Sequence, residues 1–190
     1  MAMQRERSLG RGVAAIASGM AVGIMSGRLL PPLLAAASGS VSTTLGQDPF
    51  ERLIQDHRRI LSLLDRMHAA SDASTLRRGA LFLALKRTLG KHALAEEDVV
   101  YPLLHERADA AASRQLYVEH ADMKIHLFAL ERLLKSRESW AHPVDELRQL
   151  VRRHIADEEG LQFPKLKALI DEPRRRRLNG QIRREEALLV

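Results

Sequence analysis

The sequence of 190 residues contains no cysteine. This absence excludes disulfide bonds, zinc–thiolate sites and cysteine nucleophiles, and it leaves histidine and the carboxylates as the available metal ligands. Proline and glycine are sparse between residues 50 and 170, β-branched runs are few, and 45% of all residues are hydrophobic. These features favour an all-α domain with enough apolar side chains to form a core. No serine triad, phosphate loop or dinucleotide fingerprint points to a common enzyme class.

The central region also lacks an excess of either charge. The whole chain has a formal net charge of +6, but residues 49–170 hold 20 Lys or Arg and 18 Asp or Glu, a balance of +2. The two tails together hold 10 and 6, a balance of +4. The excess positive charge lies mainly in the tails, so it suggests attachment of the protein to a membrane or a polyanion and says little about the chemistry of the central domain. A nucleic-acid partner is not expected.

Residues 1–48 are expected to form an N-terminal extension and linker. Gly12 to Gly27 run without a charge, and Gly19, Gly23 and Gly27 fall on one helical stripe, a spacing that lets membrane helices pack closely. Three interpretations remain open. Residues 12–35 attach the protein to a membrane, or they belong to a signal peptide that is cleaved near residues 35–37, or they form an extension with neither role. The corresponding locations are membrane-associated, exported and cytoplasmic.

A motif that occurs twice, sixty-two residues apart, carries most of the information in the sequence. The first copy begins at His92 and the second at His154, and a His, two Glu, an aromatic residue, a Pro and a Leu occupy identical offsets in both. Another histidine lies upstream of each copy, His57 by 35 residues and His120 by 34. The pattern predicts an internal repeat of two helical hairpins, and hence an up-and-down four-helix bundle over residues 49–170.

The apolar periodicity gives the expected helices. They cover about residues 49–70, 74–105, 110–135 and 143–170, with Asp48 as the N-cap of the first and a kink at Pro102 in the second. His57 lies within the apolar stripe of the first helix. Residues 171–190 are expected to form a basic C-terminal tail that includes a short amphipathic helix.

The spacing of the motif predicts a metal site. A His and a Glu four positions apart project from nearly the same side of a helix, so His92 with Glu96 and His154 with Glu158 would meet at one level of the bundle. Burying two carboxylates costs several kcal/mol each unless positive charge compensates them. Two divalent metals would do so and would leave charge for a bridging oxide or hydroxide. Nitrogen and oxygen ligands without sulfur fit iron, with manganese as a second candidate.

The residues His57, His92, Glu96, His120, His154 and Glu158, with the Glu-Glu-x-x-x-aromatic-Pro continuation, resemble the hemerythrin-like HHE cation-binding family. The resemblance implies a non-haem di-iron centre with these six residues as ligands and with Glu96 and Glu158 as bridges. It also implies that the protein binds or reacts with oxygen, peroxide or nitric oxide in sensing, iron handling or oxidative defence. Whether the protein is an enzyme stays open.

One position departs from the family pattern. Oxygen-carrying hemerythrins have a further histidine one turn after the first on the third helix, where this chain has Lys124. The departure favours iron binding, redox chemistry or sensing over simple oxygen carriage, and the sequence leaves open whether Lys124 points toward the site or outward. Glu97 and Glu159 would orient the histidines, act as alternative ligands or face solvent, and we favour the first role. Tyr101 and Phe163 would shield the site or pack, and we favour packing. The alternative function is a structural or interaction protein whose basic tails attach to a membrane or polyanion.

Overall fold

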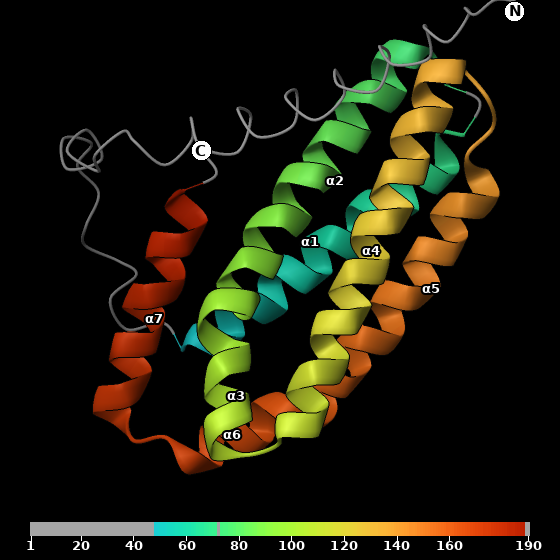
Figure 1. The fold of residues 1–190 in the computed structure, drawn as a ribbon. Coiled ribbons are helices and arrows are strands. Elements are labelled where there is room, and N and C mark those ends of the chain that lie inside the picture. The colour runs from blue at the N-terminus through green and yellow to red at the C-terminus, as the bar shows by residue number, and fades with distance from the viewer. Residues whose placement is uncertain (1–47, 72, 189–190) are drawn as a thin grey trace, which may run out of the picture. The chain divides into compact units, whose positions relative to one another are not determined.

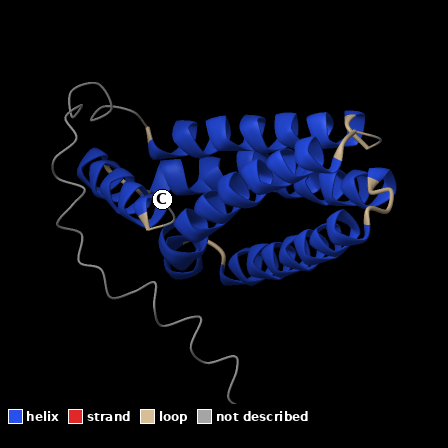
Figure 2. Ribbon diagram, turned by 90° about the horizontal axis from the view of Figure 1, so that it is seen from above, coloured by secondary structure: helices blue, strands red, loops and turns tan. Residues whose placement is uncertain are grey.

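The computed structural model describes residues 48–71 and 73–188, and all regular structure within them is helical. Four long helices lie side by side, and in order along the chain they are α1 (Pro49–Ala69), α2 (Thr75–Ala95), α4 (Ala110–Ser136) and α5 (Ala141–Asp157) (Figure 1). Figure 2 shows helices and loops, and no strand, in the part of the chain that is described. The predicted all-α class is therefore confirmed. The interpretations offered for residues 1–47 lie outside the described residues.

The starts of the long helices follow from their capping residues. Asp48 accepts a hydrogen bond from the Phe50 backbone N–H at 2.9 Å, and Pro49 takes the first helical position, where its missing N–H is not needed. Ser74 caps α2, and Asp109 caps α4 by accepting from the Ala112 N–H at 2.9 Å. The observed starts lie within a few residues of those predicted from the sequence, because a capping side chain acts only on the neighbouring backbone.

Both copies of the motif contain a π-helical turn that the sequence did not predict. These turns are η2 (Glu96–Val100) after α2 and η3 (Glu158–Gln162) after α5, and each leads into a short helix, α3 (Tyr101–Arg107) or α6 (Phe163–Leu169). The carbonyl of Glu96 accepts from the Tyr101 N–H, and that of Glu158 accepts from the Phe163 N–H. Each bond spans five residues instead of four. The chain thus continues past Pro102 and Pro164 by widening one turn.

Buried apolar side chains form two clusters along the bundle. One lies among α1, α2, α4 and α5 and includes Leu64, Met67, Leu85 and Trp140. The other includes Phe50, Leu53, Leu104, Leu116 and Leu166, from the opposite end. His57 lies between Leu53 and Ile60 on α1, and His120 lies between Leu116 and Met123 on α4, so both are located where the two clusters meet. The two buried histidines therefore lie at the boundary between the two apolar clusters.

The basic segment near the C-terminus forms a fifth long helix, α7 (Glu172–Ala187). It packs against α2, η2 and α1, and Leu178 and Ile182 are buried in the second apolar cluster. The Arg52 guanidinium and the Glu186 carboxylate form a bidentate ion pair that joins α1 to α7. The apolar side of α7 is therefore already covered by the bundle. Among the described helices, none is both long and apolar enough to span a membrane.

Candidate metal centre

The six residues singled out in the sequence come together in the middle of the bundle. His57 comes from α1, His92 from α2, His120 from α4 and His154 from α5, while Glu96 and Glu158 begin the two π-helical turns. All six are at most 3% exposed. Nitrogen and carboxylate oxygen atoms of these residues form two groups in which every ligand atom lies within 4.8 Å of the others.

The histidines are arranged as two pairs. The rings of His57 and His92 lie edge to face with their centroids 4.5 Å apart, and those of His120 and His154 lie 4.8 Å apart. The Nε2 atoms of His120 and His154 are separated by 3.2 Å. One pair therefore comes from α1 and α2, and the other from α4 and α5.

Each carboxylate contacts both histidine pairs. Glu96 Oε2 lies 3.1 Å from His92 Nε2 and 3.4 Å from His120 Nε2. Glu158 Oε2 lies 3.3 Å from His154 Nε2 and 3.2 Å from His57 Nε2. Both carboxylates thus reach from the helix that carries them to a histidine of the other pair, which is the placement that a bridging ligand requires.

Three further carboxylates surround the cluster and contact the outer nitrogen atoms of the histidines. Glu159 lies 2.8 Å from His57 Nδ1, Glu97 lies 2.9 Å from His120 Nδ1, and Glu119 lies 2.8 Å from His154 Nδ1. An ionised carboxylate only accepts hydrogen bonds, so each of these Nδ1 atoms is a donor and each Nε2 atom can present its lone pair to the centre. The roles expected for Glu97 and Glu159 agree with this geometry. Glu119 was not foreseen.

Tyr101 is the main residue that sequence reasoning missed. It is fully buried, and its hydroxyl oxygen lies 2.8 Å from Glu158 Oε1, 2.9 Å from His120 Nε2 and 3.3 Å from Glu96 Oε2. In a regular α-helix a residue five positions after Glu96 would point about 140° away. The π-helical turn returns Tyr101 to the same face as Glu96. Of the two roles considered for Tyr101, the favoured one, packing, was therefore wrong, because the hydroxyl lies at the cluster.

The matching position in the second copy is Phe163, which has no hydroxyl. Its ring stacks parallel to that of His57, with the centroids 6.0 Å apart, and it also packs on Phe50. Packing was the role expected for it. The difference between Tyr and Phe at these matched offsets is a signal in the sequence that distinguishes the two sides of the cluster.

Lys124 points away from the cluster. Its side chain is 60% exposed, and its Nζ donates to Glu97 Oε1 at 2.6 Å. The lysine thus contacts the carboxylate that holds His120 and does not take the place of a fifth histidine. On the side of His120 and His154, the hydroxyl of Tyr101 provides the additional polar group.

The protonation of the cluster without metal follows from burial and from mutual attraction. Burial and the nearby charge of Glu158 raise the pKa of Glu96. Burial opposes the charged form of His154, but Glu158 and Glu119 overcome this effect and raise its pKa to about 10. Burial also acts against ionised Glu158, yet the positive charge of His154 holds its pKa well below the usual range. A metal at this place would have to displace protons.

The donor set fits a bound metal because several buried atoms that lie close to one another form no hydrogen bond. His57 Nε2, His92 Nε2, Glu96 Oε1 and Glu158 Oε2 form no hydrogen bond within the part of the chain that the structure describes. Buried polar atoms in folded proteins are nearly always hydrogen-bonded. These four lie at the centre of the cluster, where a cation would use them as ligands.

Comparison with known proteins agrees with this donor set. A family model described as the hemerythrin HHE cation binding domain matches residues 48–166. The chain belongs to the hemerythrin HHE cation-binding family. The matched range contains all six residues of the cluster, and the resemblance noted in the sequence is confirmed. The matched range ends at residue 166, and α7 lies beyond it.

Two curated relatives resemble this HHE protein. A DNA nickase from Nostoc sp. (strain PCC 7120) is 28% identical over 137 residues, which cover 68% of this chain and 38% of the relative. An uncharacterized hemerythrin-like protein from Schizosaccharomyces pombe is 26% identical over 126 residues, covering 64% and 61%. The chain therefore spans less than two thirds of the length of each relative. No solved structure matches the chain.

Proposed function

We propose that this HHE protein is a non-haem di-iron protein that binds or reacts with a small oxidant, namely oxygen, peroxide or nitric oxide. The observation that carries the proposal is the pairing of four histidines around two shared carboxylates. His57 and His92 would hold one ion, His120 and His154 the other, and Glu96 and Glu158 would bridge them. Manganese accepts the same donors and is the second candidate metal.

The surrounding residues would prepare the site for such chemistry. Bound iron would supply electrons and an open coordination position for a small ligand. Glu97, Glu119 and Glu159 fix the orientation of three imidazoles through their Nδ1 atoms, so these rings need not reorganise when iron binds. The two apolar clusters exclude bulk water from both sides of the centre.

Tyr101 would act as a hydrogen-bond donor inside the site. Burial, together with the charges of Glu158 and Glu96, keeps the pKa of its hydroxyl well above the usual range, so the group stays protonated. A hydroxyl has one proton, and Tyr101 can direct it to Glu158 or to a small ligand held nearby. This role would polarise the ligand without adding charge to the centre.

The test is the iron content of the full chain after anaerobic loading with ferrous iron and desalting. We expect about two irons per chain, as in other four-helix bundles with a dinuclear carboxylate site. His92→Ala removes one ligand and should lower the iron content sharply while the protein stays helical. His68→Ala is the matched control, because His68 is an exposed histidine at the end of α1. Full iron retention by His92→Ala would overturn the proposal.

Exposure of the loaded protein to air then separates the possible activities. A new absorption band that disappears when oxygen is removed would indicate reversible carriage. A band that persists would indicate oxidation of the iron, as expected for sensing, iron handling or defence. Peroxide and nitric oxide are tested in the same way, and repeated turnover with any of them would show that the protein is an enzyme.

A further inference from the structure

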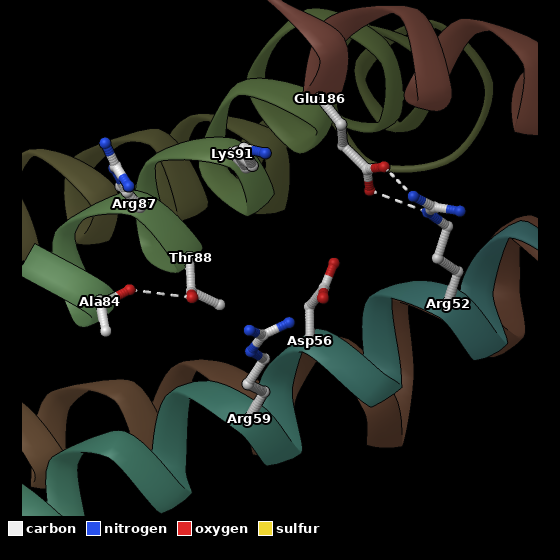
Figure 3. A pocket seen from close by; sticks show the side chains of 8 residues that line it. All are labelled: Arg52, Asp56, Arg59, Ala84, Arg87, Thr88, Lys91 and Glu186. Carbon is white, nitrogen blue, oxygen red and sulfur yellow. Dashed lines mark hydrogen bonds and ion pairs between the residues drawn. The ribbon is translucent and has the colours of Figure 1, made fainter. Parts of the chain in front are cut away.

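A second site lies outside the metal centre, in a cavity of about 510 Å³ between α1, α2 and α7 (Figure 3). Its size falls within the range of small-molecule sites in proteins. Asp56 precedes His57 and Thr88 lies one turn before His92, so the cavity adjoins the outer side of these helices, while His57 and His92 do not line it. One wall includes Glu186 of α7, beyond the region matched by the family.

The cavity has an excess of positive charge. Arg59 from α1 and Arg87 and Lys91 from α2 line it, and none of them forms an ion pair within the described residues. Arg52 and Glu186 neutralise each other in the ion pair at one end. Three unpaired cations against the single carboxylate of Asp56 leave a net charge of +2. Such a cavity attracts anions.

The cavity also presents two hydrogen-bond acceptors beside these cations. Asp56 and Thr88 point into the space between α1 and α2 in Figure 3. Asp56 lines the cavity and accepts no hydrogen bond from the residues that the structure describes. The Thr88 hydroxyl donates to the Ala84 carbonyl at 2.9 Å, which leaves its oxygen lone pairs available. Both groups would accept hydrogen bonds from a ligand that carries hydroxyl groups.

We propose that this cavity binds a small soluble phosphate ester that carries hydroxyl groups. Arg59, Arg87 and Lys91 would contact the phosphate, since guanidinium and ammonium groups form charge-assisted hydrogen bonds with phosphate oxygens. Asp56 and Thr88 would accept from the hydroxyl groups. The arrangement selects against a bare anion, because an ionised Asp56 repels negative charge unless a donor separates the two.

The test is calorimetric titration of the full chain with ribose 5-phosphate, inorganic phosphate and ribose. We expect saturable binding of one ribose 5-phosphate per chain, weaker binding of inorganic phosphate, and none of ribose. The double variant Arg87→Gln, Lys91→Gln should weaken binding of ribose 5-phosphate by at least about tenfold, since it removes two charged hydrogen-bond donors. The control is Lys86→Gln, Arg132→Gln, which removes the same charges outside the cavity.

Asp56→Asn tests the hydroxyl contacts separately. It should reduce the preference for ribose 5-phosphate over inorganic phosphate, because binding of the bare anion no longer meets a negative charge. An unchanged preference would overturn the role of Asp56. Absence of saturable binding, or equal affinity of the two double variants, would overturn the site. The proposal would also be overturned if the protein bound phosphatidic acid vesicles through Arg87 and Lys91 but did not bind ribose 5-phosphate. None of these outcomes depends on iron.

Discussion

Four polar atoms at the centre of the cluster lead to a prediction about iron and stability. His57 Nε2, His92 Nε2, Glu96 Oε1 and Glu158 Oε2 are buried without a hydrogen-bond partner in the described chain. A buried polar group without a hydrogen bond costs about 1–3 kcal/mol, and here the attraction between His57 Nε2 and Glu158 Oε2, 3.2 Å apart, and between His92 Nε2 and Glu96 Oε2, 3.1 Å apart, offsets part of that cost. Native domains are stable by only about 5–15 kcal/mol. We therefore expect a marginally stable metal-free protein, and an increase of several kcal/mol in its free energy of unfolding when iron binds.

The assay is urea denaturation of the full chain, followed by circular dichroism, with a chelator and with excess ferrous iron in the absence of oxygen. For each site, the free energy of unfolding should rise by about 1.4 kcal/mol per tenfold increase in free iron above the dissociation constant. The slope against urea should stay the same, because the surface exposed on unfolding is unchanged. Calcium should have little effect, since it prefers oxygen ligands alone.

Two variants check that the effect comes from the cluster. His92→Ala should lose most of the iron-dependent increase, whereas His68→Ala, with its exposed histidine, should keep it. Equal urea midpoints with and without bound iron would refute the reasoning, because the four atoms would then not be a source of instability.

Three other predictions follow from the packing and the electrostatics. Trp140→Ala should cost about 3–5 kcal/mol in urea denaturation, because the ring is fully buried and its Nε1–H donates to the Met67 carbonyl at 3.2 Å; a loss below 1 kcal/mol would contradict this. Tyr101→Phe should keep two irons per chain but change the absorption of the oxidised protein, and an identical spectrum would remove Tyr101 from the site. Without metal, the stabilisation from charged His154 should be complete below pH 6.5 and decline as the pH approaches its folded pKa of about 10. The urea midpoint should therefore fall over this range, and less steeply in Glu119→Gln, while iron affinity should rise with pH because binding displaces this proton.

Sequence patterns predicted the four long helices and the six residues that meet at the centre. Helix caps such as Asp48 act locally, and a His and a Glu four positions apart share a face in any α-helix. Helical periodicity assigns side chains to the wrong face where the backbone leaves the α-helical geometry. The π-helical turn after Glu96 moves Tyr101 to the inner face, and a periodicity of 3.6 residues assigns it to the wrong side.

Contacts between different helices could not be predicted from the sequence either. Glu119 precedes His120 on α4 but contacts His154 on α5, and this pairing depends on the register between two helices. The docking of α7 depends on Leu178 and Ile182 finding an apolar surface made by other segments. Periodicity shows that a helix has an apolar side, but it does not show which part of the protein covers that side.

The outer nitrogen of His92 gives the two histidine pairs of the centre different affinities for metal. His92 Nδ1 is buried and has no hydrogen-bond partner in the described chain, whereas His57, His120 and His154 each contact a carboxylate. A carboxylate partner makes an imidazole a stronger electron donor, and its loss typically lowers metal affinity by about 10- to 100-fold. The pair from α4 and α5 should therefore fill first, and the pair from α1 and α2 should fill and empty at higher metal concentrations. The iron supply would then set whether the protein holds one ion or two.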